Sequence, residues 1–130
     1  MERVLICGDR NWSDPVIIMK ELSAVQQTLG VEVVIEGEAT GADTMGRQAA
    51  EVLGIPVLKF PALWRKHGRS AGPIRNRQML KEGKPTMVLA FHPFLENSKG
   101  TKDMVNVATK AGVPVKIFDG KKKPLVQEIK

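Results

Sequence analysis

Five short apolar runs rich in Val and Ile recur along the chain, and longer stretches with helical spacing separate them. The runs span residues 3–8, 31–36, 55–60, 86–91 and 113–118, and Gly or Pro residues bound them. Apolar runs of this length are typical of strands that are buried on both faces. Because such runs alternate with helical stretches, the chain predicts a mainly parallel sheet with right-handed crossovers.

The stretches between the runs cover residues 15–29, 42–53, 73–81 and 101–110. Asp14 before Pro15 predicts a helix start, because Asp caps the free N–H groups and Pro suits the first helical position. A glycine follows each stretch and predicts a left-handed helix end; these glycines are Gly30, Gly54, Gly83 and Gly112. We therefore predict an α/β fold, a single Rossmann-like three-layer domain with a five-stranded mainly parallel sheet and helices on both faces.

The domain is expected to span residues 1–120, and residues 121–130 form a basic C-terminal tail that is either a short extra strand or a frayed end. No apolar run is long enough to span a bilayer, and the N-terminus lacks the pattern of a signal peptide. The single cysteine, Cys7, cannot form an internal disulfide and suits a buried structural thiol. We expect a cytoplasmic protein with no membrane partner.

Positive charge is concentrated in one part of the chain. The net charge is +6, and residues 61–84 hold seven Lys or Arg residues against the single acid Glu82. A focused basic segment favours a discrete anionic ligand over a broad duplex footprint, although nucleic acid remains a less favoured partner. His67 and His92 lack the spacing of metal ligands, and no Walker A or GxGxxG motif is present. We expect neither a metal nor a cofactor.

Every polar, glycine-bearing segment follows a predicted strand. These segments are residues 8–12, 37–43, 61–76 and 92–101. Ligands of open parallel sheets bind beyond the carboxyl ends of the strands, so this edge is the predicted site. Trp64 lies in the third segment, where it could stack on a base or cover the core.

The segment "GEATGAD" places Gly37 and Gly41 around a turn, with Asp43 in the first turn of the next helix. Small residues allow the backbone to approach a ligand closely, and free N–H groups at a helix start favour phosphate. The alternative is a tight turn in which Asp43 only complements the helix dipole.

The segment "NSKGT" has the same form at the start of the last helix, with Ser98, Lys99, Gly100 and Thr101. Helix capping would explain Ser98 or Thr101, but it explains neither Lys99 nor Gly100. We therefore predict that this segment contacts phosphate.

The segment "AGPIRN" predicts a helix that begins at Pro73, with Arg75 and Asn76 in its first turn. A cation at a helix start opposes the helix dipole unless an anion is beside it. That anion is either a ligand or a carboxylate, for which Asp43 and Glu36 are the candidates.

Together, "ICGDRNW", "EGEATGAD", "ALWRKHGRSAGPIRNRQML", "LAFHPFLENSKGTKDM" and "AGVPVKIF" resemble the SLOG superfamily, in its YspA/YpsA-related branch of phages and bacteria. The resemblance covers about residues 1–120. It implies a Rossmann-like fold, a nucleotide or nucleotide-derived (ADP-ribose-like) ligand, and a homo-oligomer. It also implies a pocket lined by Gly8, Arg10, Gly41, Ala42, Asp43, Arg75, Asn76, Gly100 and Thr101.

The related LOG phosphoribohydrolases carry a Pro-Gly-Gly-x-Gly-Thr-x-x-Glu signature, whereas this chain has "NSKGTKDM", with Met104 in place of the glutamate. Methionine cannot handle a proton or stabilise positive charge. The first hypothesis is therefore a module that senses or captures a nucleotide. The alternative is an N-glycoside hydrolase in which Asp43 or Glu36 supplies the catalytic carboxylate, and Asp103 could also substitute. A second alternative is nucleic-acid binding by residues 65–84 and the tail.

Overall fold

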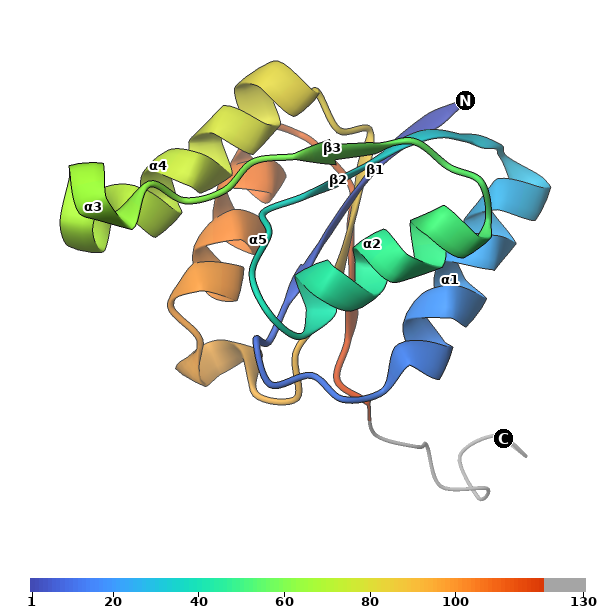
Figure 1. Ribbon diagram of the computed structural model, residues 1–130, viewed down its shortest axis with the longest axis horizontal. Coiled ribbons are helices and arrows are strands. Elements are labelled where there is room, and N and C mark those ends of the chain that lie inside the picture. The colour runs from blue at the N-terminus through green and yellow to red at the C-terminus, as the bar shows by residue number, and fades with distance from the viewer. Residues whose placement is uncertain (121–130) are drawn as a thin grey trace.

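Five parallel strands form one sheet in the order β3-β2-β1-β4-β5 (Figure 1). The computed structural model describes residues 1–120. The strands are β1 (Glu2–Gly8), β2 (Val31–Glu36), β3 (Val57–Lys59), β4 (Met87–Phe91) and β5 (Val115–Phe118). The predicted Rossmann-like α/β fold with a parallel sheet is confirmed, and every strand pairing is parallel.

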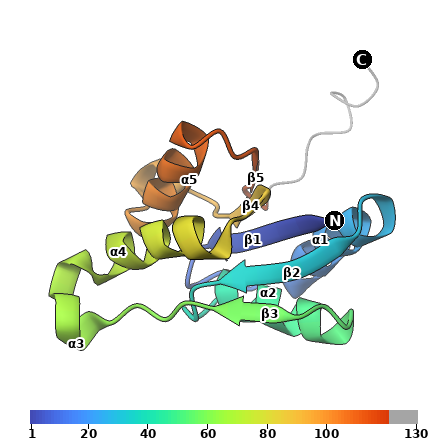
Figure 2. The same ribbon diagram turned by 90° about the horizontal axis from the view of Figure 1, so that it is seen from above.

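Helices cover both faces of the sheet, as Figures 1 and 2 show. On one face lie α1 (Pro15–Thr28) and α2 (Ala42–Val52); on the other lie α4 (Ala71–Gln78) and α5 (Gly100–Lys110). Successive residues of a strand point to opposite faces. Val4 and Ile6 accordingly pack into the core beneath α1 and α2, while Leu5 and Cys7 pack into the core beneath α4 and α5. Both faces of the central strand are therefore buried.

The predicted start of α1 is confirmed, because the Asp14 carboxylate accepts a hydrogen bond from the Val16 N–H at 3.0 Å. Left-handed glycines follow three helices as predicted, at Gly30, Gly54 and Gly112. These caps end the helices at the edge of the sheet opposite to the predicted site.

The fourth glycine, Gly83, differs from the prediction. It lies inside a π-helical turn, η2 (Met79–Gly83), and Lys84 takes the left-handed conformation with φ of 50°. A Cβ at Gly83 would lie 3.1 Å from the Ile35 side chain. Close packing against β2, and not a left-handed backbone, explains the glycine.

The helix expected to begin at Pro73 begins two residues earlier, at Ala71. It continues directly from α3 (Trp64–His67) and a 3₁₀ turn, η1 (Gly68–Ser70), which lie beyond the ends of the strands (Figure 1). Pro73 occupies the third helical position, where its missing N–H costs no intrahelical hydrogen bond. Because α4 begins directly after η1, its start is not a free helix end.

The tail predicted for residues 121–130 lies outside the described residues, so its strand and frayed-end alternatives stay predictions. Cys7 is buried, as expected. Within residues 1–120, no helix combines the length and the apolar character needed to cross a membrane.

Candidate functional site

A cavity of about 280 Å³ opens at the carboxyl ends of β1 and β4. The chain leaves β1 toward β2 on one side and leaves β4 toward β5 on the other, so these strands flank the topological switch point of the sheet. Open α/β sheets bind ligands at this point. The cavity is therefore where the predicted edge would hold a ligand.

The cavity brings together predicted residues from four separate segments. These are Gly8, Arg10, Asp43, Arg75, Asn76, Ser98, Lys99, Gly100 and Thr101. Glu36, Gly37, Gly41, Ala42 and Trp64 do not line it. Binding by any of these residues stays a prediction, but the geometry separates those that reach the cavity from those that do not.

Further lining residues were not predicted, namely Cys7, Asp9, Ala39, Met79, His92 and Met104. Asp9 and His92 directly follow β1 and β4, so their positions in the sequence were enough to predict that they lie at the ligand-binding edge of the sheet. Met104 is 1% exposed and closes the cavity with an apolar side chain where the LOG signature has glutamate.

Asp43 braces the loop between β2 and α2. Its Oδ2 accepts hydrogen bonds from the Gly37 and Ala39 N–H groups, each at 3.2 Å, and the residue is 6% exposed. Burial raises the pKa of Asp43 from 3.8 to about 6, while the Ala39 hydrogen bond and the charge of Arg75 lower it. Asp43 is therefore a carboxyl group with a raised pKa at the wall of the cavity.

Gly41 sets the approach of two loops. It has φ of 71°, and a Cβ there would overlap the backbone carbonyl of Asp9. The Ala42 N–H donates to that same carbonyl at 3.1 Å. Gly41 and Ala42 thus fix the wall of the cavity from behind, and the Ala42 N–H is already occupied.

Arg75 crosses the mouth of the β2–α2 loop. Its Nη1 donates to the Gly37 carbonyl at 2.6 Å, and its Nε donates to Asn76 Oδ1 at 3.1 Å. A Cβ at Gly37 would overlap the Arg75 guanidinium. Gly37 therefore makes room for the Arg75 guanidinium, and it does not itself line the cavity.

The helix-dipole reason for a partner of Arg75 does not hold, because α4 begins at Ala71 and Arg75 lies past its first turn. No carboxylate of residues 1–120 forms an ion pair with Arg75, Arg10 or Lys99. Three cations thus face the cavity without a carboxylate bound to any of them.

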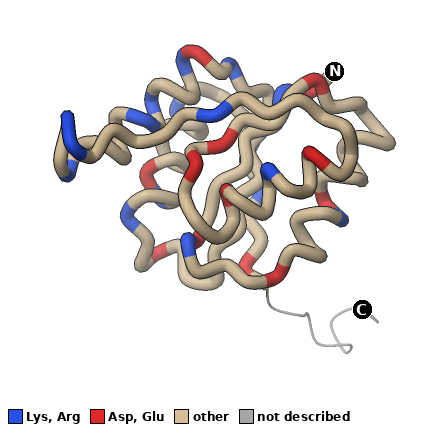
Figure 3. Tube along the Cα trace, in the orientation of Figure 1, with Lys and Arg blue, Asp and Glu red and all other residues tan. Residues whose placement is uncertain are grey.

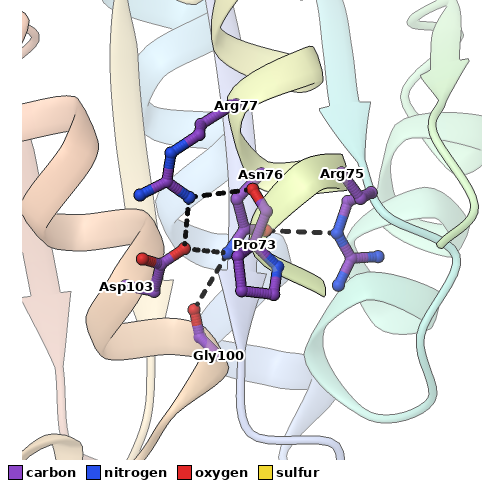
Figure 4. A network of polar contacts seen from close by, with 6 residues as sticks. All are labelled: Pro73, Arg75, Asn76, Arg77, Gly100 and Asp103. Carbon is purple, nitrogen blue, oxygen red and sulfur yellow. Dashed lines mark hydrogen bonds and ion pairs between the residues drawn. The ribbon is translucent and has the colours of Figure 1, made fainter. Parts of the chain in front are cut away.

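Asn76 joins α4 to the start of α5 (Figure 4). Its Nδ2 donates to the Gly100 carbonyl at 3.2 Å and to Asp103 Oδ2 at 3.0 Å. Arg77 also contacts Asp103 Oδ2, at 3.4 Å. Asn76 is 3% exposed, both of its Nδ2 hydrogens are donated and its Oδ1 accepts from Arg75, so its geometry suits positioning of the two helices.

The start of α5 points its N-terminus at the cavity. The Ser98 hydroxyl accepts a hydrogen bond from the Thr101 N–H at 3.0 Å, whereas Lys99 is exposed. A Cβ at Gly100 would meet nothing within 4 Å, so the first turn is open. An open helix N-terminus beside a lysine favours an anion.

Glu36 lies at the end of β2 but is fully buried and away from the cavity. Its Oε1 accepts from the Glu38 N–H at 2.6 Å, and its Oε2 has no partner among residues 1–120. Burial raises the pKa of Glu36 from 4.5 to about 7, and the Glu38 hydrogen bond lowers it. Glu36 is thus not placed to act on a ligand in this cavity.

Trp64 lies on α3 and is 51% exposed, so it neither lines the cavity nor covers the core. Among residues 1–120, no group of three or more His, Cys, Asp and Glu side chains could hold a metal ion.

Comparisons with known proteins identify a family and a fold. The profile of the YspA, cpYpsA-related SLOG family (YAcAr) matches residues 2–67. The Gene 61 protein of Mycobacterium phage D29 is 35% identical over 127 residues, which cover 93% of this chain and 99% of that protein. DNA processing protein A (DprA) from Streptococcus pneumoniae has a similar structure, with a TM-score of 0.69 and 18% identity over 98% of this chain. The match spans 56% of the DprA chain, and at this identity it concerns the fold.

Proposed function

The chain belongs to the YspA, cpYpsA-related SLOG family, and from this premise we propose that it binds a nucleotide or nucleotide-derived molecule as a sensing or ligand-capturing module. One observation carries the proposal. Arg10, Arg75 and Lys99 face one cavity beside the open N-terminus of α5, and none of them forms an ion pair with a carboxylate of residues 1–120. A phosphate group would satisfy these cations and the helix end together.

Arg75 is the most strongly oriented of the three cations. Its hydrogen bonds to the Gly37 carbonyl and to Asn76 hold the guanidinium in place before a ligand arrives. Asn76 is in turn held by Gly100 and Asp103. A donor oriented in advance loses little conformational entropy on binding, so we expect Arg75 to contribute most to affinity.

The size of the cavity limits what it can enclose. Small-molecule sites usually measure roughly 300–1,000 Å³, and this cavity of about 280 Å³ lies just below that range. We therefore propose that it encloses the phosphate and sugar of the ligand, while the base lies at the rim.

Asp43 supports a second candidate, hydrolysis of the N-glycosidic bond. It lines the cavity, and its pKa of about 6 leaves it mainly ionised at neutral pH. The carboxylate would take a proton from a water molecule that attacks the anomeric carbon. The bond from that carbon to the base nitrogen would break, and the proton taken up by Asp43 would pass, directly or through water, to the leaving base.

Thermal melting with nucleoside monophosphates and matched nucleosides tests the binding proposal. At a concentration about a hundredfold above the dissociation constant, a nucleotide should stabilise the protein by roughly 2.7 kcal/mol, whereas the nucleoside should not. Lys99→Gln should weaken the effect, and Lys110→Gln, at the other end of α5, is the matched control. Equal stabilisation by nucleosides and nucleotides would contradict the proposal that the cavity binds phosphate.

Chromatography of the same mixtures separates capture from hydrolysis. Ligand recovered unchanged supports a capturing module. Release of free base by the native protein, lost in Asp43→Asn, supports the hydrolase. Mass spectrometry of small molecules released from the denatured protein would then identify the base.

A further inference from the structure

Residues Leu63–Ser70 form a basic arm that extends beyond the carboxyl ends of the strands (Figures 1 and 2). The arm holds α3 and η1 and runs directly into α4. Lys and Arg occupy its tip, and the arm contains no Asp or Glu (Figure 3). It is therefore a surface of one charge sign that belongs neither to the cavity nor to the core.

The cations of the arm have no ion-pair partner among residues 1–120. Arg65, Lys66 and Arg69 are all exposed, and none forms an ion pair with a side chain of residues 1–120. None of them lines the nucleotide cavity. The charges of Arg65, Lys66 and Arg69 thus serve neither an ion pair within residues 1–120 nor the lining of the cavity.

Trp64 gives the same arm an exposed aromatic ring. A Cβ at Gly72 would lie 3.6 Å from Trp64 Cη2, so one edge of the indole is supported by α4. Trp64 is 51% exposed and adjoins Leu63, which is 52% exposed. Trp12, by contrast, is 7% exposed and donates its indole N–H to the Asp14 carbonyl. Trp64 is therefore placed for contact with a partner and not for core packing.

We propose that the basic arm binds single-stranded nucleic acid, with Trp64 stacking on a base and Arg65, Lys66 and Arg69 contacting phosphates. Stacking on aromatic rings beside backbone-tracking cations is the usual way to bind unpaired strands. A helix of a single turn is too short to read a groove, so the binding is expected to be independent of sequence. A second copy of the chain would need carboxylates to match three cations, whereas a nucleic-acid strand supplies phosphates at regular spacing.

Fluorescence anisotropy with a labelled oligothymidine of about 12 nucleotides, within the usual site size, tests the proposal on the full chain. With up to three phosphate contacts, log affinity should fall against log salt with a slope of about −2. Binding should also quench the fluorescence of Trp64, while that of buried Trp12 stays constant. A duplex of the same length should bind more weakly.

Two variants and one matched control decide the outcome. Replacement of Arg65, Lys66 and Arg69 by Gln should weaken binding at least about tenfold and flatten the salt slope. The control replaces three exposed lysines on α1, α5 and β5, Lys20, Lys110 and Lys116, by Gln and should change affinity less than about threefold. Trp64→Ala should weaken binding roughly five- to a hundredfold and abolish the quenching.

Equal effects of the arm and control substitutions, or an unchanged affinity in Trp64→Ala, would show that the arm does not bind nucleic acid. A molecular mass in solution that falls in the arm variants, without oligonucleotide binding by the native protein, would assign the arm to contact with a second copy. Stabilisation by mononucleotides should be unaffected by the arm variants, so the two proposals can fail independently. Thermal melts would verify that each variant is folded.

Discussion

Replacement of Glu36 by Gln should make the protein more stable above neutral pH, with the gain disappearing at acid pH. Glu36 is fully buried, and one of its carboxylate oxygens has no partner among the described residues. Burial, as the largest cause, raises its pKa from 4.5 to about 7. The ionised carboxylate is therefore disfavoured in the folded protein.

The sign of the pH effect follows from proton uptake. Between about pH 4.5 and 7, the folded protein keeps a proton on Glu36 that the unfolded chain has released. The free energy of unfolding therefore falls as pH rises through this window, and the full penalty is present above it. At about 1.36 kcal/mol per pKa unit, the penalty is on the order of 3 kcal/mol.

Gln has the size of Glu, can accept the hydrogen bond from the Glu38 N–H, and carries no charge. Its second group, an amide –NH₂, costs free energy when unpaired, but this cost does not depend on pH. The stability of Glu36→Gln relative to the native protein should therefore rise by about 2–3 kcal/mol from pH 4.5 to 8. The stability of the Glu36→Gln variant itself will still depend on pH, because the pKa of Asp43 is also raised, to about 6.

Urea denaturation of both proteins at several pH values measures this difference. Glu82→Gln, which removes an exposed carboxylate, is the control and should show a difference that hardly varies with pH. A difference that is constant from acid to alkaline pH would refute the reasoning, since it would mean that Glu36 ionises normally in the fold. Nucleotide binding should be unchanged in Glu36→Gln, and a loss of ligand cleavage would restore Glu36 as a catalytic candidate.

Three further predictions concern the wall of the cavity. Arg75→Ala should cost roughly 1.5–3 kcal/mol of nucleotide binding, the range for a hydrogen bond to a charged group, and titration would measure it; unchanged affinity would make Arg75 purely structural. Gly37→Ala should give a similar loss of affinity with a native-like melt, because only the mobile end of the Arg75 side chain must move. Gly41→Ala should destabilise the fold by about 3 kcal/mol or more, because its Cβ meets backbone at a positive φ. Equal melting temperatures for the two alanine variants would contradict this account of both glycines.

The fold was predictable because apolar runs that alternate with helical stretches are typical of a parallel sheet covered on both faces. That topology also brought Gly8, Arg10 and Lys99 to one edge, since Gly8 ends β1 and the other two lie in loops that follow strands. The direction of a side chain at the end of a strand was not predictable. Glu36 follows Ile35 in β2 and is buried without lining the cavity, an outcome that depends on the local register and twist of the strand.

The environment of Arg75 was predicted less well than its position. The Gly-Pro pair indicated a helix start at Pro73, whereas α4 continues from η1 and begins at Ala71. Pro is accepted throughout the first turn of a helix, so it does not fix the first residue. The projection of Trp64 on the basic arm was equally hidden, because no sequence pattern states how far a segment leaves the body of the protein.

The strand order has a consequence for how the protein is made. β1 pairs with β2, which follows it closely, but also with β4, whose Met87 lies opposite Val4. A growing chain therefore leaves one edge of β1 unpaired until β4 has been synthesised, and pairings of such long sequence separation form slowly. Because the cavity has one wall from each half of the chain, neither half can form it alone. A ligand that binds there would contact both halves and so stabilise the newly folded protein against separation of β1 from β4.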